Sequence, residues 1–184
     1  MNLSFEALDR HVIAGRAAEP ALRGGGRDWD FARLLEEVAT LAGAMRGLGV
    51  APGARVVVTD ASPRTRLLAC LAALRLGAVP VLDGDPATAT LLVAATPPPA
   101  DAAVPAVIVE GDGAVVESRD WALELALRAG RTDPAPPADP PPGAPSYVVG
   151  DTEVREPEVE SVLGAALAAL VAGRPVDVPA PDGR

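Results

Sequence analysis

Hydrophobic positions recur at helical spacing in four parts of the chain. The clearest run covers Asp30–Leu48, where Asp30 is a good N-cap and the apolar residues form one stripe. A second run, Pro63–Leu76, follows Ser62 and is apolar over much of its circumference. Ser4–Ala14 and the alanine- and leucine-rich segment Glu158–Ala172 have the same kind of pattern. The sequence therefore predicts helices over these four ranges.

Short apolar runs between these segments predict strands. Arg55–Thr59 contains three consecutive valines and is typical of a strand buried on both faces, and Val79–Leu82 follows the helix at Pro63–Leu76. A strand, helix, strand unit places its two strands parallel in one sheet. Further strands are expected at Ala106–Glu110 and Tyr147–Val149. The alternation predicts an α/β fold, a three-layer sandwich with a mostly parallel sheet.

Other segments give weaker patterns. Glycines 24–26 suit a hairpin or flexible turn without a preceding strand, and Ala87–Ala95 fits a short helix. A hairpin turn is expected at Gly111–Gly113, leading to a strand at Ala114–Val116. Asp120–Arg128 has a helical pattern.

The chain has the length of one domain, so we expect residues 1–184 to form a single α/β unit. Asp133–Pro145 has seven prolines in thirteen residues and predicts an extended, solvated linker or loop. Arg174–Arg184 is expected to be a loose, flexible tail.

Charge excludes some classes of partner. The net charge is -9, and all sixteen cationic residues are arginines without a basic stripe. Such a chain is a poor binder of nucleic acid or of an anionic membrane, because phosphate neutralisation supplies most of that affinity. No segment reaches the roughly 20 apolar residues that span a bilayer, and a signal peptide is not apparent. We therefore expect a cytoplasmic protein. The excess of Arg, Ala, Pro and Gly indicates a bacterium with a GC-rich genome.

Candidate site residues follow the two best-defined strands. Thr59, Asp60 and Ser62 come after the first strand, and Asp83 and Asp85 come after the second. Open α/β sheets bind their ligands at the carboxyl ends of the strands, so these residues are candidates for a pocket. The alternative is structural, with Ser62 as a helix N-cap and the two later aspartates in a turn and a cap before a helix.

Other residues with reactive or charged side chains favour structural roles. Arg64 and Arg66 could bind a carboxylate or a phosphate, or could form a solvated helix face. Cys70 lies in an apolar run and is expected to be a buried small hydrophobe. His11 is the only histidine, and we expect it at the surface or partly buried. No spacing typical of a metal site is present, and no cofactor is expected.

Three stretches carry a resemblance to a known family: Trp29–Val58, the Ser62-Pro63 turn and Leu71–Pro86. Their order and spacing resemble the amino-terminal part of the AMP-binding superfamily, the adenylate-forming enzymes that include acyl-CoA synthetases. The resemblance implies the fold of their amino-terminal subdomain. It extends to short AMP-binding-like proteins of actinobacteria whose activity is unknown.

The family's ATP chemistry depends on a loop rich in Ser, Thr and Gly that ends in Pro-Lys-Gly. When Pro157 is placed on the proline of that loop, Glu158 falls on the lysine. The preceding loop positions then include Asp151, Thr152, Glu153 and Arg155. A phosphate site needs inward-pointing N–H groups and positive charge, whereas this segment is acidic. We therefore expect a degenerate phosphate loop that does not bind ATP in the family's manner.

The acidic run Asp151–Glu160 has two structural interpretations. It could cap and start the last helix, because carboxylates are favourable at the positive end of a helix. Alternatively, it could form an acidic docking surface for a basic partner.

The resemblance suggests a truncated, non-catalytic homologue, since the chain ends before the family's adenine-binding and ribose-binding segments. Such a protein would act through protein association or through a residual small-molecule pocket. A homo-oligomer or a protein partner would cover the apolar face that packs against a neighbouring subdomain in full enzymes. The alternative is a nucleotide- or acyl-binding enzyme that uses the carboxyl edge of the sheet, either alone or completed in trans by a partner.

Overall fold

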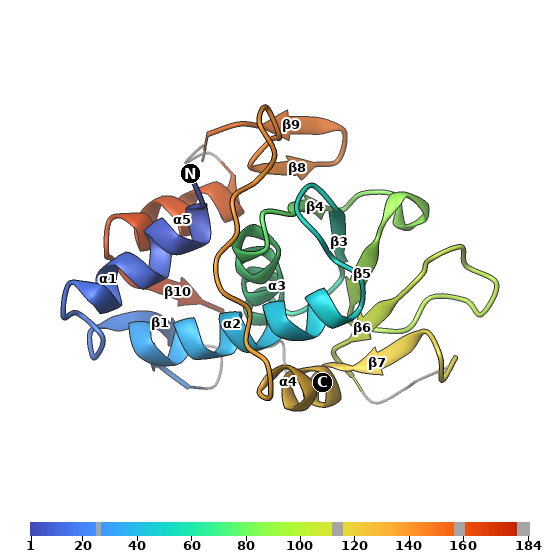
Figure 1. Cartoon of the computed structure of the whole chain (residues 1–184), viewed down its shortest axis with the longest axis horizontal. Coiled ribbons are helices and arrows are strands. Elements are labelled where there is room, and N and C mark those ends of the chain that lie inside the picture. Colours follow the sequence, from blue (N-terminus) through green and yellow to red (C-terminus); the bar gives the residue numbers. More distant parts are fainter. Residues whose placement is uncertain (25–26, 112–115, 157–160, 180–184) are drawn as a thin grey trace.

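The computed structural model describes residues 1–24, 27–111, 116–156 and 161–179. Within these ranges the chain forms a seven-stranded and a three-stranded sheet (Figure 1). The large sheet has the strand order β7-β6-β5-β3-β4-β8-β9, and all neighbours are parallel except β8 and β9. Its strands are β3 (Arg55–Thr59), β4 (Val79–Leu82), β5 (Leu91–Ala94), β6 (Val107–Val109), β7 (Asp120–Ala122), β8 (Tyr147–Val149) and β9 (Thr152–Val154). The predicted α/β class with a mostly parallel sheet is confirmed.

The centre of the fold is the predicted strand, helix, strand unit. Helix α3 (Pro63–Arg75) begins after Ser62, whose hydroxyl accepts a hydrogen bond from the amide of Thr65. Strands β3 and β4 are parallel, with Val57 opposite Val81. Because side chains alternate across a strand, β3 contributes Val56 and Val58 to the core beneath the helices and Val57 to a second apolar cluster on the other face.

Helices form two layers on one face of the large sheet. Helix α3 contacts β3 and β4, α4 (Leu123–Gly130) contacts β6 and β7, and α2 (Phe31–Gly47) packs across both helices. The sheet, the α3–α4 layer and α2 are consistent with a three-layer sandwich. Ala89, Ala102 and Val104, from the connections between strands, pack on the opposite face of the sheet.

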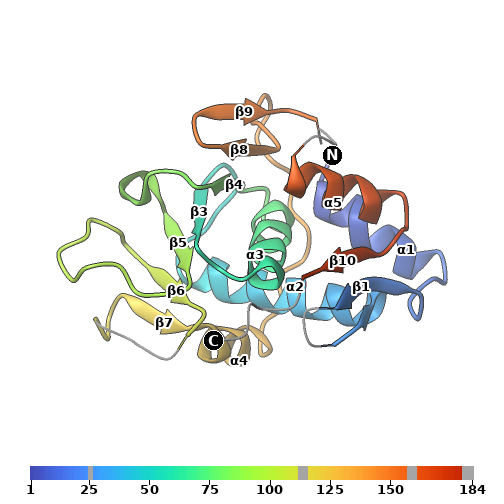
Figure 2. The same ribbon diagram turned by 180° about the vertical axis from the view of Figure 1, so that it is seen from behind.

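The second sheet lies at the end of the molecule opposite β7, as both views show (Figures 1 and 2). Strand β1 (Pro20–Gly24) pairs with β2 (Trp29–Asp30) antiparallel and with β10 (Val176–Val178) parallel. Nearby are η1 (Phe5–Asp9), α1 (Arg10–Ile13) and α5 (Val162–Val171).

This sheet corrects two predictions and supports a third. The expected loose tail from Arg174 contains β10, which the sequence analysis missed. The glycine-rich segment is preceded by β1, although no strand was expected there. The antiparallel pairing of β1 and β2 agrees with a hairpin at this segment, but Gly25 and Gly26 themselves lie outside the described residues.

The proline-rich segment 133–145, hereafter the strap, has no helix or strand, and most of its residues are exposed. It crosses α2 and α3 on its way from α4 to β8 (Figure 1). Ala135 is buried, its amide donates to the carbonyl of Ala39, and its own carbonyl accepts from Nε of Arg75 at 2.6 Å. Ala138 donates to the carbonyl of Arg75 and accepts from Nδ2 of Asn2. The strap is thus an extended loop with mostly exposed residues, as predicted, but the hydrogen bonds of Ala135 and Ala138 hold it on the body.

Local assignments differ in two further places, and a third is not described. The helix expected at Ala87–Ala95 is wrong, since the chain forms a short 3-10 turn, η2 (Pro86–Thr88), followed by strand β5. The helix expected from Asp120 starts at Leu123, because residues 120–122 pair with β6 as strand β7. Residues 112–115, which include most of the predicted turn and following strand, lie outside the described residues.

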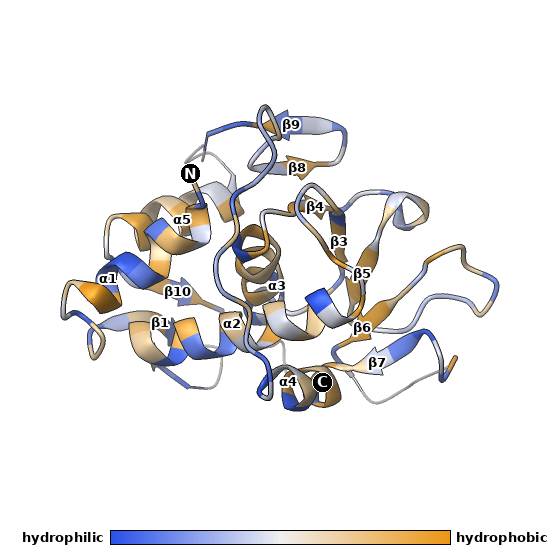
Figure 3. Cartoon of the chain, in the orientation of Figure 1, coloured by the Kyte–Doolittle hydropathy of each residue, from blue (hydrophilic) through white to orange (hydrophobic). Residues whose placement is uncertain are grey.

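Helix α5 is shorter than predicted but is placed correctly in the sequence. It spans Val162–Val171, and Ser161 caps it by accepting a hydrogen bond from the amide of Gly164 at 2.9 Å. Its residues carry no charge, and it is among the most hydrophobic elements in Figure 3. None of the helices formed by the described residues is long and apolar enough to cross a membrane.

Candidate functional site

A cavity of about 610 Å³ opens at the carboxyl ends of β3, β4 and β8. Helix α3 forms one wall, α5 forms another, and β10 from the small sheet closes a third side. Its apolar lining residues are Ala61, Pro63, Leu67, Cys70, Leu82, Val149, Val162, Leu163, Ala166, Val176, Val178 and Pro179. Its polar lining residues are Arg66, Asp83, Ser161 and Asp177. The volume is within the usual range for small-molecule sites, roughly 300–1,000 Å³.

The Arg66–Asp83 ion pair lies in the lining of this cavity. Asp83 directly follows β4 and has a φ of 53°, a left-handed conformation that places its carboxylate 2.5 Å from Nη2 of Arg66. The side chain of Asp83 is 61% exposed. The pair therefore remains accessible from the cavity mouth.

The other two polar lining residues differ in their partners. The hydroxyl of Ser161 is engaged at the N-cap of α5 and lies 2.9 Å from the hydroxyl of Tyr147. Asp177, on β10, is exposed and forms no ion pair or side-chain hydrogen bond with another described residue. Because side chains alternate along β10, Val176 and Val178 face the core, and the Asp177 side chain lies on the exposed face beside Arg23 of β1.

Cys70 contributes an inert wall to the cavity. Its side chain is fully buried, as predicted, and burial raises the pKa of the thiol to about 12. The thiolate is the reactive form of cysteine, so the thiol remains unreactive at neutral pH.

A second cluster lies where the strand order changes direction. The chain runs from β3 to β4 on one side and then continues with β5 and β6 on the other side of β3. In open α/β sheets the crevice at such a point is the usual ligand position. Here Glu110, which follows β6, accepts hydrogen bonds from the amide of Ser62 at 2.6 Å and the hydroxyl of Thr65 at 2.6 Å. The hydroxyl of Ser62 also donates to Glu110.

Glu110 therefore binds the amino terminus of α3 with three hydrogen bonds. A helix amino terminus attracts anions because its first amides are unpaired and its dipole is positive. The chain's own carboxylate fills the place where a ligand phosphate would otherwise bind.

The structure separates the residues predicted for the pocket. Asp83 lines the cavity, whereas Thr59 is the half-buried last residue of β3. Asp60 is exposed, with a φ of 48°. Ser62 is the N-cap of α3, and Asp85 caps η2 by accepting from the amide of Ala87 at 2.9 Å. The capping alternatives for Ser62 and Asp85 are confirmed.

The arginines on α3 are engaged with the protein rather than solvated. Arg64 donates from Nη2 to the carbonyls of Gly24 and Arg27, and its guanidinium lies 4.3 Å from the ring centroid of Trp29. Burial lowers its pKa, and the nearby carboxylate of Asp28 acts in the opposite direction. Arg64 thus fastens the β1–β2 pair to α3.

The segment predicted as a degenerate phosphate loop begins as a β-hairpin. Asp151 lies in the turn after β8, and Thr152 and Glu153 are exposed on the antiparallel edge strand β9. The expectation that the acidic run starts the last helix is wrong for Asp151–Val154, because Asp151 lies in a turn and Thr152–Val154 pair with β8. Pro157 and Glu158 lie outside the described residues.

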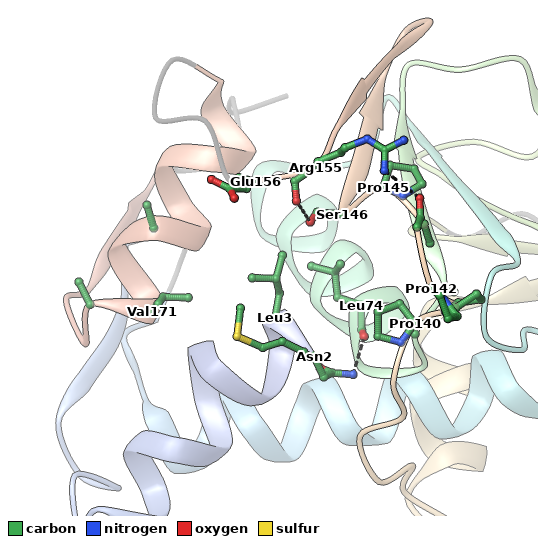
Figure 4. A pocket seen from close by; sticks show the side chains of 18 residues that line it. Asn2, Leu3, Leu74, Pro140, Pro142, Pro145, Ser146, Arg155, Glu156 and Val171 are labelled. Atoms are coloured by element: carbon green, nitrogen blue, oxygen red, sulfur yellow. Dashed lines mark hydrogen bonds between the residues drawn. The ribbon is translucent and has the colours of Figure 1, made fainter.

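Arg155 and Glu156 line a different cavity, of about 760 Å³ (Figure 4). Its walls come from the first three residues of the chain, the strap, α3 and α5. Arg155 donates from Nη1 to the carbonyl of Gly143 at 3.0 Å and forms an ion pair with Glu153. Ser146 donates to the carbonyl of Arg155, and Nδ2 of Asn2 donates to the carbonyl of Leu74 (Figure 4). Most polar side chains here hold the cavity walls together.

His11 is buried, so the prediction of a surface or partly buried position is wrong. Nη1 of Arg16 donates to its Nδ1 at 3.1 Å, because arginine is a donor only. Nε2 therefore carries the proton and donates to the carbonyl of Leu170 at 2.8 Å. His11 joins α1 to α5. Among the described residues, no group of three or more His, Cys, Asp or Glu side chains could hold a metal ion.

Comparison of the chain with known proteins does not assign it to a family. No protein-family model matches the chain. Over 85 residues the chain is 40% identical to an uncharacterized protein of Pseudomonas aeruginosa. This match covers 43% of the chain and 14% of the relative. The matched segment is thus less than half of the chain and a small part of the relative's length.

Sequence reasoning missed Glu110 and Asp177. Glu110 directly follows β6, so the rule that selected Asp60 and Asp83 at strand ends would also have selected Glu110. Asp177 lies on β10, in the segment that was predicted to be a tail. No sequence signal pointed to its position on a strand that pairs with β1.

Proposed function

We propose that the chain is a non-catalytic relative of adenylate-forming enzymes that binds a small apolar molecule in the cavity between α3, α5 and β10. The observation that carries this proposal is the cavity itself, which combines twelve apolar lining residues with a few polar ones. Binding sites for small molecules have this composition. The cavity also lies at the carboxyl ends of parallel strands, where ligands of α/β sheets bind.

Two features argue against the nucleotide-binding alternative. The amino terminus of α3 already binds Glu110, so a phosphate would have to displace a carboxylate that makes three hydrogen bonds. The hairpin that would hold the triphosphate carries Asp151 and Glu153 and the ion-paired Arg155. Each carboxylate about 4 Å from a phosphate charge costs roughly 1 kcal/mol in bulk water and about 4 kcal/mol near a protein surface.

Calorimetric titration tests this assignment. ATP, AMP and an acyl-CoA should give no saturable heat, whereas the neutral probe 4-phenylbutanol should bind and should lose binding in Ala166→Trp, which fills the cavity from α5. Micromolar nucleotide binding that disappears in Asp83→Asn would favour the alternative instead. Asparagine tolerates the positive φ at this position, so that variant keeps the turn. Absence of 4-phenylbutanol binding would overturn the proposed function.

A second candidate function is protein association. Val162, on the uncharged helix α5, is 92% exposed, so a partner or a second copy of the chain would bury this side chain. Analytical ultracentrifugation at rising concentration tests self-association, and Val162→Glu should abolish it. A monomer at every concentration removes the homo-oligomer from consideration. Completion in trans would instead appear as co-purification with one defined partner.

The remaining expectations from the sequence stay predictions. We propose a cytoplasmic location, and we propose an actinobacterial origin because the resemblance to short actinobacterial proteins agrees with the composition. A net charge of -9 supports the further proposal that nucleic acid is not a partner.

A further inference from the structure

We propose that the cavity between α3, α5 and β10 selects a ligand with an apolar body and an uncharged head group that both donates and accepts hydrogen bonds, namely a primary carboxamide. This inference rests on the proposed function, because it names the ligand class of the same cavity. It follows from the Arg66–Asp83 ion pair in the lining, whose two charges cancel.

The apolar body follows from the inner walls. Leu67 on α3, Leu82 at the end of β4 and Leu163 on α5 are almost completely buried, yet each contributes to the lining. Cys70 adds a thiol that stays neutral at physiological pH because burial raises its pKa to about 12. The inner surface thus offers no ionised group, and an alkyl or aromatic group is the part of a ligand that fits there.

The polar part of the lining narrows to one pair of side chains. The carboxylate of Asp177 lies on the exposed face of β10, away from the core. The hydroxyl of Ser161 is engaged at the N-cap of α5. Arg66 and Asp83 remain, one positive and one negative, so a head group in the cavity meets a donor and an acceptor without a net charge.

The ion pair leaves hydrogen-bonding groups open to a ligand. Its contact joins Nη2 of Arg66 to Oδ2 of Asp83 at 2.5 Å, and the two side chains are 32% and 61% exposed. The other guanidinium N–H groups and Oδ1 of Asp83 have no partner among the described residues. A carboxamide carries the complementary groups on adjacent atoms, because its carbonyl accepts from an arginine and its N–H donates to a carboxylate.

Charged head groups fit this pair less well. A carboxylate that approaches Arg66 is repelled by the neighbouring Asp83, and an ammonium group near Asp83 is repelled by Arg66, so attraction and repulsion largely cancel. An ion also loses its hydration when it enters an apolar cavity, which costs far more than the same transfer of an amide. The uncharged head group is therefore favoured.

Four probes with the same phenylpropyl body test the inference: 4-phenylbutyramide, its N,N-dimethyl derivative, 4-phenylbutyrate and 4-phenylbutylamine. At pH 7.5 the last two are ionised. Calorimetry and saturation-transfer NMR should show 4-phenylbutyramide binding about tenfold more tightly than either ion. It should bind about threefold more tightly than the dimethyl derivative, which keeps the carbonyl but has no N–H. Near-physiological salt, with a screening length of about 8 Å, weakens the effect of exposed charges outside the cavity.

Substitutions of the pair should reverse the preference in opposite directions. Asp83→Asn keeps the turn, since asparagine tolerates a positive φ, and leaves Arg66 as a net positive charge. It should strengthen the carboxylate relative to the amide about fivefold, and Arg66→Met should do the same for the amine. The matched control Arg46→Met breaks an exposed arginine–aspartate pair outside the cavity and should change each affinity less than about twofold. Circular dichroism verifies that each variant is folded.

The outcomes separate the inference from the proposed function through 4-phenylbutanol, the probe of that function. If neither 4-phenylbutanol nor any of the four probes binds, both proposals are overturned. If 4-phenylbutanol binds but an ion or the dimethyl derivative binds as tightly as 4-phenylbutyramide, the carboxamide ligand alone is overturned. The carboxamide ligand is also overturned if the substitutions of Arg66 and Asp83 shift the preference no more than Arg46→Met does.

Discussion

Replacing Arg75 tests the finding that the strap is part of the folded body. Arg75 is the last residue of α3, and its guanidinium binds both carboxylate oxygens of Asp9, at 2.7 and 3.1 Å. Its Nε holds the buried carbonyl of Ala135 in the strap. One side chain therefore connects the N-terminal helical segment, α3 and the strap. Arg75→Met keeps the aliphatic stem and removes all three charge-assisted hydrogen bonds.

The magnitude follows from burial. The side chains of Arg75 and Asp9 are 6% and 14% exposed, so the variant leaves a nearly buried carboxylate without its partner. Breaking a buried ion pair in this way costs about 3–5 kcal/mol, and the unpaired carbonyl of Ala135 adds about 1–3 kcal/mol. These contributions overlap because they share one side chain. We expect a loss of about 4 kcal/mol from a total stability of about 5–15 kcal/mol.

Urea unfolding followed by circular dichroism measures the free energy of unfolding. The matched control is Arg46→Met, which removes an exposed ion pair with Asp133 and should cost less than about 1 kcal/mol. The double variant Asp9→Leu with Arg75→Met should recover part of the loss, because no carboxylate is then left unpaired. Hydrogen exchange at Ala135 and Ala138 reports on the strap directly, since both amides donate to the body.

A loss below about 1 kcal/mol for Arg75→Met, or unchanged protection of both strap amides, would show that Arg75 does not hold the strap. If Arg75→Met lowers the free energy of unfolding strongly and the double variant recovers none of it, the broken ion pair is not the cause of the loss.

Four further predictions follow from other contacts. Gly130→Ala should cost about 1–3 kcal/mol in urea unfolding, because its Cβ would lie 2.0 Å from the carbonyl oxygen of Thr40. Ser4→Ala should raise stability by up to about 1 kcal/mol in the same assay, because the buried hydroxyl has no partner among the described residues. Glu110→Ala should cost about 1.5–3 kcal/mol and make the melting temperature rise with sulfate, since it frees the amino terminus of α3 for an anion. The Cys70 thiol should not react with a thiol reagent at pH 7.5 in the folded state, because burial raises its pKa to about 12. Between about pH 9 and pH 12 the unfolded chain has lost a proton that the folded chain retains, so the free energy of unfolding should fall by about 1.4 kcal/mol per pH unit. Cys70→Ala should remove this contribution to the slope.

The elements that sequence reasoning placed correctly have local signals. Ser62 and Pro63 specify the start of α3, and Gly77, with a φ of 66°, lies just beyond its end. Each signal acts through the backbone of the next few residues, so no distant partner is needed. The three consecutive valines of β3 favour a strand, because β-branched side chains are restricted in a helix.

The missed strands depend on distant partners. Val176–Val178 becomes β10 because it pairs with β1, where Leu22 lies opposite Val176. Leu91–Ala94 follows alanines and threonines that suit a helix equally well, and only pairing with β3 makes it a strand. Three- or four-residue strands carry too little pattern of their own to be recognised.

The same distinction separates the parts of the candidate site. The capping roles of Ser62 and Asp85 were predictable, because their partners lie within three residues. Glu110 lies 48 residues from Ser62, and the contact exists only because β6 is two strands from β3. Prolines indicated that the strap has no helix, but Arg75 and Asn2 determine where it is fastened.

Glu110 also gives the amino terminus of α3 a permanent anionic partner. A helix amino terminus without a partner leaves unpaired amides and uncompensated dipole charge. A bound ligand stabilises a protein only while its concentration exceeds the dissociation constant. Glu110 supplies the anion covalently, so its three hydrogen bonds to Ser62 and Thr65 stabilise α3 at all times. On the proposed relationship to adenylate-forming enzymes, this internal carboxylate makes the fold independent of nucleotide and leaves the cavity beside α5 as the accessible site.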